Sequence, residues 1–326
     1  MRAIIANSLG SPGVFELQEV ASPEPGEKQV LVQLHATGVN FAETERRRGV
    51  YATPSFPWCP GAEGAGEIVG VGPGADSNLM GKRVAFWGPG TTVSGTYAEY
   101  AAVSVDALFH LSDKISFDVG AALPLQGLTA YGLAYFAGRI REEMAVLIHA
   151  AAGGVGQLLV QMVRNQGARV FATTSTTEKA DIVAGLGAEP FLYGDDLRDH
   201  IAKATDGRGV DLVYDSIGKA TQGQSLSLLA PYGELIHFGE ASGPAGAILP
   251  EQLYDRSLKV SAFGLNTDRD PAVWTKARRD LLSWIEDGTL KVSIPVRLPL
   301  EQASEAHRLL ESRATTGKVI LYQGTS

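Results

Sequence analysis

The sequence predicts an α/β protein in which a doubly wound parallel sheet follows a mainly β segment. Up to about residue 120, short apolar segments are separated by glycine, and beyond that point apolar strands alternate with segments of helical spacing. A further observation agrees with this prediction. The 38 glycines among 326 residues fall singly or in small groups between apolar runs, as tight turns require.

The first part of the chain contains short strand candidates bounded by turns. Residues 29–36 alternate polar and apolar side chains after a turn rich in proline and glycine. Further strands are predicted at 67–71 and 83–87, each close to glycine. This spacing fits a curled, partly open barrel or sandwich.

The pattern changes near Asp118. Residues 146–150 form an apolar run suited to a strand buried on both faces, and apolar side chains then recur with helical spacing from Val155 to Val163. We predict further strands at 169–173, 211–214, 234–238 and 259–263, with helices at 178–186, 196–204 and 220–229. After about residue 266 the pattern predicts a helix, a short strand, another helix and a closing strand at 318–322, and it leaves open which domain they join.

Composition and charge exclude several classes of protein. The net charge of −8 gives no general footprint for nucleic acid, and no apolar run approaches the roughly 20 residues that span a bilayer. The first residues show no long apolar region followed by a small-residue cleavage site, so we expect no secretory signal. The single cysteine, Cys59, cannot form an internal disulfide, and a cytoplasmic location is expected.

A glycine-rich turn lies between the predicted strand 146–150 and its helix. It has the G-x-G-x-x-G spacing, with Ala151 at the first glycine position. Gly153 would let the backbone approach a pyrophosphate, and Gly156 would let the helix pack closely on the strand. The start of the helix would supply free N–H groups for the phosphates. We predict a dinucleotide site, with a plain tight turn as the alternative, at Ala152, Gly153, Gly154, Val155 and Gly156.

The end of the second strand of this series indicates NADPH rather than NADH. NAD-binding folds place a carboxylate there to hold the ribose 2′-hydroxyl, whereas this chain offers Thr174, Ser175 and Lys179 to a 2′-phosphate. Glu178 has capping-box spacing from Ser175, so we expect it to fold back onto its own helix. Tyr193 is a further candidate beside the adenosine ribose. The alternatives are a solvated Lys179 and a Tyr193 of the core or surface.

Motifs along the whole chain occur in the order of one family. The sequence resembles the zinc-free quinone oxidoreductases and ζ-crystallins of the medium-chain dehydrogenase superfamily. The motifs that carry the resemblance are Gly38–Phe41, Arg48–Tyr51, Pro60–Gly66, Gly95–Tyr100, Leu123–Ala130, Leu147–Gly156 with Gln161 and Arg164, and Gly317–Leu321.

The resemblance implies a fold in which a Rossmann sheet is inserted into a GroES-like β-barrel catalytic domain. Residues 1–122 and 267–326 would form the catalytic domain, and residues 123–266 the NADPH-binding domain. It also implies a homodimer formed by pairing of strand 259–263 across a two-fold axis. An unpaired apolar edge strand would otherwise invite aggregation.

The resemblance also implies the absence of metal. The positions of the early zinc ligands of related alcohol dehydrogenases correspond to Asn40 and Ala62, which leaves only Glu63. A catalytic zinc needs about three protein ligands. The four-cysteine structural lobe is absent because Cys59 is the only cysteine, and the six histidines show no paired ligand spacing.

Without a metal to polarise an oxygen, the substrate must accept hydride readily and delocalise the charge, as quinones and α,β-unsaturated carbonyls do. The resemblance places Asn40 and Thr129 near the nicotinamide, where they would orient the ring and a substrate carbonyl. Tyr51 could donate a hydrogen bond or a proton. Their structural alternatives are a loop bridge for Asn40, a helix cap for Thr129 and a cleft-lining role for Tyr51.

Weaker cofactor candidates follow later in the chain. Ser216 and Gly239 come after predicted strands, whose ends face the cofactor crevice of such folds. Lys318 could reach a phosphate, although a solvated strand lysine is the alternative.

Other functions stay open. One is a reductase of enoyl thioesters or another specific metabolite, and Arg46-Arg47-Arg48 could then recognise an anionic substrate, although a solvated helix face is the simpler interpretation. Another is an NADPH-binding protein with a structural or regulatory role. Glu43 stands where many relatives carry aspartate, and its extra methylene is expected to alter the surroundings of Asn40.

Overall fold

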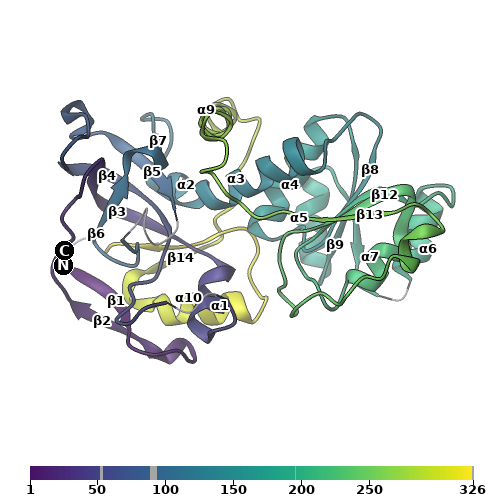
Figure 1. Ribbon diagram of the computed structural model, residues 1–326, viewed down its shortest axis with the longest axis horizontal. Coiled ribbons are helices and arrows are strands. Elements are labelled where there is room, and N and C mark those ends of the chain that lie inside the picture. The colour runs from purple at the N-terminus through teal and green to yellow at the C-terminus, as the bar shows by residue number, and fades with distance from the viewer. Residues whose placement is uncertain (52–53, 89–93, 195, 325–326) are drawn as a thin grey trace. The chain divides into compact units, whose positions relative to one another are not determined.

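The computed structural model describes residues 1–51, 54–88, 94–194 and 196–324 (Figure 1). The chain divides into two compact units. One unit comprises Met1–Leu125 and Thr275–Ser326, and the other comprises Gln126–Trp274. No helix within the described ranges is long and apolar enough to cross a lipid bilayer.

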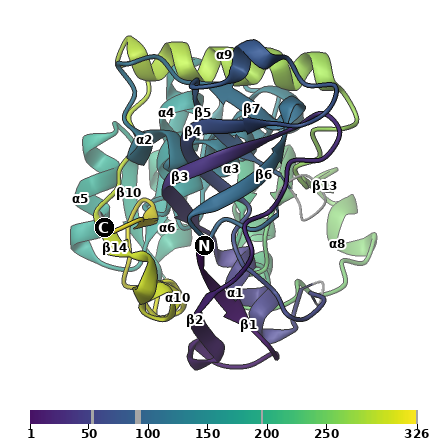
Figure 2. The same ribbon diagram turned by 90° about the vertical axis from the view of Figure 1, so that its left-hand side faces the viewer.

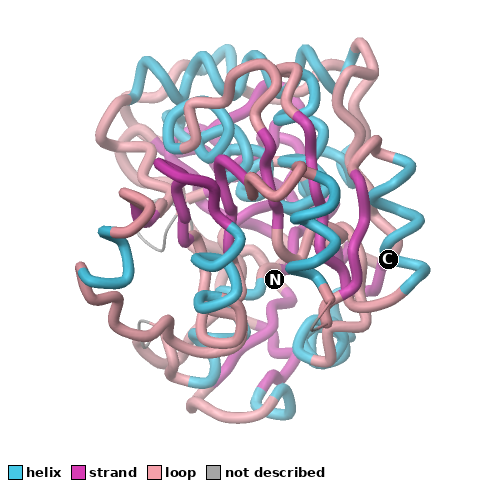
Figure 3. The backbone as a smooth tube through the Cα atoms, turned by 90° about the vertical axis from the view of Figure 1, so that its right-hand side faces the viewer, coloured by secondary structure: helices cyan, strands magenta, loops and turns pink. Residues whose placement is uncertain are grey.

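The unit Gln126–Trp274 is built on a six-stranded parallel sheet, which confirms the predicted doubly wound architecture. The spatial order β10-β9-β8-β11-β12-β13 reverses direction between β8 and β11, where such sheets bind their ligands. Figure 3 shows helices and loops flanking the strands of this sheet. The strands are β8 (Ala145–Ile148), β9 (Arg169–Thr174), β10 (Glu189–Leu192), β11 (Val210–Asp215), β12 (Leu229–His237) and β13 (Lys259–Ala262).

Helices connect these strands as the alternating pattern predicts. All four residues of β8 are buried, as expected for a central strand covered on both faces. The core beneath α6 and α7 joins Leu147, Phe171, Val213 and Leu235 from four neighbouring strands. The helices are α4 (Gly154–Asn165), α5 (Thr177–Gly185), α6 (Leu197–Ala204), α7 (Gln222–Leu228) and α8 (Glu251–Tyr254), preceded by α3 (Pro124–Gly132).

The other unit contains a mainly antiparallel seven-stranded sheet and a separate hairpin of β1 and β2. The main sheet has the order β14-β15-β3-β4-β5-β7, and β6 also pairs with β3. Its predicted strands are present, and β3 and β4 extend beyond their predicted bounds. The strands are β1 (Arg2–Ala6), β2 (Phe15–Glu19), β3 (Gln29–Val39), β4 (Glu63–Val71), β5 (Arg83–Trp87), β6 (Tyr100–Ser104), β7 (Leu108–His110), β14 (Val296–Pro299) and β15 (Val319–Tyr322).

The end of the chain joins the sheet formed by its beginning. β15 pairs antiparallel with β3, so Val319 lies opposite Val39. The C-terminal elements drawn in yellow accordingly lie among the purple N-terminal elements in both views (Figures 1 and 2). The helices of this unit are α1 (Phe41–Arg48), α2 (Phe117–Ala122), α9 (Pro271–Glu286, which starts in the other unit) and α10 (Ala303–Glu311).

Candidate functional site

The glycine-rich turn connects β8 to α4. Ala150 has a left-handed backbone with φ of 50°, and its carbonyl accepts a hydrogen bond from the Gly153 N–H at 3.0 Å. A Cβ atom on Gly156 would lie only 2.6 Å from the Ala151 carbonyl oxygen. The first turn of α4 therefore rests directly on the backbone of the preceding turn, and only glycine fits at position 156.

The start of α4 has the properties of an anion-binding site. Its N-cap, Gly153, provides no side-chain hydrogen bond, and its first turn carries no acidic residue. The N–H groups of this turn and the helix dipole are therefore not neutralised by the helix's own side chains. Gly154 is covered by the side chain of Gln126. A Cβ on Gly153 would meet, among the described residues, no atom within 4 Å except the Ala150 carbonyl oxygen at 3.3 Å.

The end of β9 leads directly into α5. The hydroxyl of Thr174 is buried and donates to the Thr176 carbonyl at 3.3 Å, whereas Ser175 is exposed and Lys179 is half-buried. Burial lowers the pKa of Lys179. Ser175 and Lys179 thus remain accessible polar groups at this strand end.

The helix cap at this point lies one residue later than predicted. Thr176, not Ser175, is the N-cap of α5, and its side chain accepts a hydrogen bond from the Lys179 N–H. Glu178 is therefore the second helical residue. Its carboxylate still folds back onto the start of the helix. There it accepts hydrogen bonds from its own N–H and from the Thr176 side chain, and these bonds lower its pKa. This carboxylate therefore belongs to the helix start, as expected.

Tyr193 is attached to the glycine-rich turn. Its hydroxyl accepts a hydrogen bond from the Ala150 N–H at 2.9 Å, and its ring stacks on His149 with 13° between the ring planes. Tyr193 is 36% exposed, so it lies at the surface and not in the core, with its hydroxyl held by the turn. It links the strand after α5 to the end of β8.

A buried polar network that includes Asp215 holds the ends of β8, β9 and β11. His149 contacts Thr173 at 2.7 Å and Ser225 at 3.0 Å, and the Ser225 hydroxyl donates to Asp215. Burial lowers the pKa of His149 to about 4, so its ring is neutral at physiological pH. Asp215 also accepts from the Ile217 and Gly218 N–H groups and from Thr221. The network fixes the shape of the loop that carries Ser216.

Two of the weaker cofactor candidates lie side by side. A Cβ on Gly239, just after β12, would approach the Ser216 carbonyl oxygen to 3.1 Å.

Thr129 lies inside α3 and is half-buried, so the alternative of a helix-capping threonine is wrong.

In the other unit, Asn40 is held by charged groups rather than by loop backbone alone. Its Nδ2 donates to Glu63 Oε1 at 2.8 Å, and its Oδ1 accepts from Lys318 Nζ at 2.5 Å. Its backbone N–H donates to the carboxylate of Glu43. These contacts fix the orientation of the amide at the start of α1, where only 6% of Asn40 is exposed.

Lys318 is fully buried, so the alternative of a solvated strand lysine is wrong. Its ammonium forms an ion pair with Glu63, and both side chains are 0% exposed. The second oxygen of Glu63 accepts from the Leu125 N–H at 2.8 Å. A buried charge is stable only when paired and hydrogen-bonded in this way. The structure therefore gives Lys318 protein partners in place of the predicted phosphate.

A second buried group of side chains surrounds Glu43. The Tyr97 hydroxyl donates to Glu43 Oε2 at 2.9 Å and lies 3.0 Å from His307 Nε2. Burial is the main cause that raises the pKa of Glu43 to about 7 and lowers that of His307 to about 3. Glu43 Oε1 has no hydrogen-bond partner among the described residues.

The three arginines of α1 do not form a solvated face. Arg47 is 1% exposed and forms an ion pair with Glu311 from α10, and its guanidinium lies 6.0 Å from the centre of the Phe15 ring. Arg48 is partly exposed and lies 3.6 Å from the same carboxylate. The prediction of a solvated face is wrong for Arg47 because α10, far away in the sequence, covers that side of α1.

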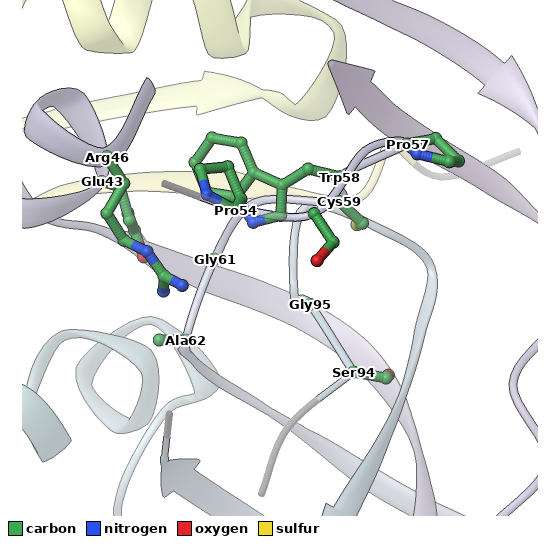
Figure 4. Close-up of a pocket in the computed structure, with 11 residues that line it drawn as sticks. Glu43, Arg46, Pro54, Pro57, Trp58, Cys59, Gly61, Ala62, Ser94 and Gly95 are labelled. Carbon is green, nitrogen blue, oxygen red and sulfur yellow. The ribbon is translucent and has the colours of Figure 1, made fainter. Parts of the chain in front are cut away.

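A pocket with a volume of about 310 Å³ lies beside α1. Glu43 and Arg46 line it from the helix, and Trp58, Cys59 and Ala62 line it from the segment before β4 (Figure 4). Tyr51 is not among its lining residues, and the Tyr51 side chain is 59% exposed just after the end of α1.

Two protein-family profiles match the chain. The alcohol dehydrogenase GroES-like domain matches residues 26–113, and the zinc-binding dehydrogenase profile matches residues 186–321. A probable quinone oxidoreductase of Schizosaccharomyces pombe is 37% identical over 319 residues, which cover 97% of this chain and 95% of the relative. The chain belongs to the quinone oxidoreductase family.

Solved structures of this family have the same fold. Escherichia coli quinone oxidoreductase complexed with NADPH matches with a TM-score of 0.91 and 32% identity, covering 99% of this chain and 100% of that one. A mycobacterial protein complexed with NADPH matches with a TM-score of 0.93 and 33% identity, again over 99% and 100% of the two chains.

One matching profile is described as a zinc-binding dehydrogenase, which raises the question whether the residues of this member of the quinone oxidoreductase family could hold a metal ion. The described part of the chain contains no group of three or more His, Cys, Asp or Glu side chains able to hold a metal ion. Glu63 already contacts the ammonium of Lys318 and the amide of Asn40. A second cation beside this carboxylate would meet the positive charge of Lys318.

Sequence reasoning did not find the side-chain contacts that hold Asn40 and Glu43 in place. Tyr97 belongs to one of the motifs that the chain shares with the family, but the contact of its hydroxyl with Glu43 joins residues 54 positions apart in the sequence. His307 carries no local signal, because its histidine stands alone in an amphipathic helix. Lys318 was visible only as a lysine at the start of a strand. Such groups are identified by long-range contacts and not by spacing.

Proposed function

We propose that this protein is an NADPH-dependent reductase that transfers hydride to quinones or α,β-unsaturated carbonyls without zinc. The observation that carries the proposal is the turn before α4, where Gly156 packs on the Ala151 carbonyl and the helix start has no side-chain cap. This arrangement suits a pyrophosphate. The family to which the chain belongs and the NADPH complexes of its structural relatives support the same cofactor.

The residues of the parallel-sheet unit suit the parts of a dinucleotide. The N–H groups of Ala152 and of the first helical residues, Gly154–Gly156, would hold the pyrophosphate. Gly153, whose own N–H donates to the Ala150 carbonyl, would let the pyrophosphate approach the backbone. Ser175 and Lys179 would hold the 2′-phosphate. Tyr193 would lie at the adenosine ribose, and Ser216, Gly239 and Thr129 would contact the rest of the cofactor. An acidic residue at the end of β9 would repel the 2′-phosphate, and Glu178 is turned back onto α5 instead.

Bound NADPH would supply a hydride to the conjugated system of the substrate. Asn40 has one N–H of Nδ2 left after its bond to Glu63, and we propose that it donates to the substrate carbonyl oxygen, on which negative charge develops. Lys318 and Glu63 would hold this amide in position. The exposed hydroxyl of Tyr51, or water, would then supply the proton to the reduced product.

The proposed chemistry uses no metal. Glu63, the one carboxylate at the zinc-ligand positions, is paired with Lys318. The charge that develops on the substrate is spread over its conjugated system. Positioning of cofactor and substrate supplies the rest of the rate enhancement.

Nucleotide binding and turnover test this function in one experiment. We expect the protein to bind NADPH at least about tenfold more tightly than NADH, because a charged hydrogen bond to the 2′-phosphate contributes about 1.5–3 kcal/mol. Oxidation of NADPH by 1,4-benzoquinone should be unchanged after dialysis against EDTA. Loss of activity with the chelator, restored by Zn²⁺, would contradict the zinc-free mechanism.

The same experiment separates the other candidate functions. Turnover of a short enone without turnover of quinones would assign the protein to enone or enoyl reduction. Tight NADPH binding without turnover of any acceptor would favour a structural or regulatory role.

We also propose a homodimer that forms through β13. This strand is at the edge of the parallel sheet and pairs on one side with β12. Because an unpaired edge strand is a liability, pairing with a second copy would protect it. Light scattering coupled to gel filtration should give twice the chain mass of 34.5 kDa. A particle with the mass of one chain, 34.5 kDa, throughout the micromolar range would contradict the dimer.

A further inference from the structure

The pocket beside α1 contains an arginine, Arg46, that has no ionic partner among the described residues. Glu311 pairs with Arg47 and also lies 3.6 Å from Arg48. No carboxylate among the described residues pairs with Arg46, and its Nε is buried without a hydrogen-bond partner. Two of the three consecutive arginines therefore contact Glu311 of α10, and no described carboxylate compensates the charge of the third.

The position of Arg46 makes this charge available to a ligand. Arg46 lines the pocket, and Figure 4 shows its guanidinium extending from α1 toward the segment that carries Gly61 and Ala62. The guanidinium also lies 5.8 Å from the centre of the Trp58 ring, a cation–π contact that restricts its orientation. A guanidinium held in this way presents paired N–H donors that match a carboxylate or a sulfonate.

The other ionisable groups of the pocket leave its charge positive below neutral pH. Burial raises the pKa of the Cys59 thiol to about 12, so the thiol is uncharged. The Glu43 carboxylate accepts hydrogen bonds from the Tyr97 hydroxyl and the Asn40 N–H, and His307 contacts the same hydroxyl from its other side. The charge of Lys318 lowers the pKa of Glu43, and the charge of Glu63 raises it. Burial raises its pKa to about 7, so below that pH the carboxyl is protonated and Arg46 carries the charge.

The volume of the pocket limits what it can hold. A volume of about 310 Å³ lies at the lower end of the roughly 300–1,000 Å³ of ligand pockets. One ring or a short acyl chain fits, whereas the nucleotide portion of a coenzyme A thioester would have to lie elsewhere.

We propose that this pocket is a substrate subsite that selects small quinones or enones bearing a carboxylate or sulfonate, and that Arg46 is the residue that recognises the anionic group. The proposal rests on the proposed reductase function and adds its substrate class. Arg46 sets specificity and takes no part in hydride transfer.

A pair of matched substrates tests this assignment. One is a 1,4-benzoquinone that carries a propanoate chain, and the other is its methyl ester, which has the same ring but no charge. We expect Arg46→Gln to raise KM for the carboxylate by about 10- to 100-fold, the range that loss of a charged hydrogen bond gives. KM for the ester and kcat for both substrates should stay close to the wild-type values.

Two further variants control for folding and for general charge. Arg46→Lys should restore part of the affinity for the carboxylate. Arg48 lies on the same helix, and its side chain is 43% exposed. Arg48→Gln removes this charge and should leave both KM values unchanged. In the wild type, KM for the carboxylate alone should rise above pH 7 as Glu43 ionises and adds negative charge to the pocket.

Equal changes for the carboxylate and the ester, or no change for either in Arg46→Gln, would overturn the proposal. Calorimetric binding of the two quinones gives the same comparison without turnover. If the ester and unsubstituted benzoquinone fail to oxidise NADPH, the proposed function fails, while a charge preference in binding would still support the subsite.

Discussion

Replacing Lys318 with methionine should lower the free energy of unfolding by about 3–5 kcal/mol, the usual cost of removing one partner of a buried ion pair. The side chains of Lys318 and Glu63 are both 0% exposed. Without the ammonium, the partners that the described residues offer to the buried Glu63 carboxylate are the Asn40 amide and the Leu125 N–H. Urea unfolding of the wild type and the variant measures the difference.

The chain provides a matched control for this prediction. Lys276 also pairs with a carboxylate, that of Asp280, but its side chain is 59% exposed on α9. Lys276→Met should cost less than about 1 kcal/mol, because water and side-chain entropy weaken surface ion pairs. Adding Glu63→Gln to Lys318→Met should recover part of the loss by removing the unpaired charge. Equal losses for both single variants would contradict a special role for the buried pair.

Replacing Gly156 with alanine should weaken NADPH binding by about 100-fold, since the phosphates would lose charged hydrogen bonds worth about 1.5–3 kcal/mol each. The new Cβ would lie 2.6 Å from the Ala151 carbonyl oxygen and 2.7 Å from that of Ala150. Both are backbone atoms, so α4 would have to move away from the turn. Fluorescence titration with NADPH measures the change in Kd.

Gly223 provides the control for this second variant. It also lies in a helix of the same unit, α7, but a Cβ there would meet no atom of the described residues within 4 Å. Gly223→Ala should leave Kd unchanged and stabilise the protein slightly, because alanine is the better helix former. Unchanged NADPH binding in a folded Gly156→Ala variant would show that the cofactor does not depend on this close approach.

Local pattern was sufficient for the alternation of strands and helices in the parallel sheet, except for its edge strand β10. The apolar run of β8, the glycines after it and the helical spacing of α4 are adjacent in the chain, and each follows from side-chain periodicity or backbone conformation. Near Thr176 the pattern came within one residue of the true cap, because several neighbouring hydroxyl side chains can serve as N-cap. The half-exposed strand β10, Glu189–Leu192, has no such periodicity and was missed.

The sequence by itself determined where strands and helices alternate, where the glycine-rich turn lies and which ligand positions lack zinc-binding side chains. Only the tertiary structure decided that Lys318 and Arg47 are buried, that Glu43 contacts Tyr97, and that Arg46 lies on Trp58 with no carboxylate partner among the described residues. The physical reason is that burial and charge pairing depend on contacts between residues far apart in the chain, here as many as 278 positions for Lys318 and Asn40. Local spacing carries no information about which distant element will cover a given side chain.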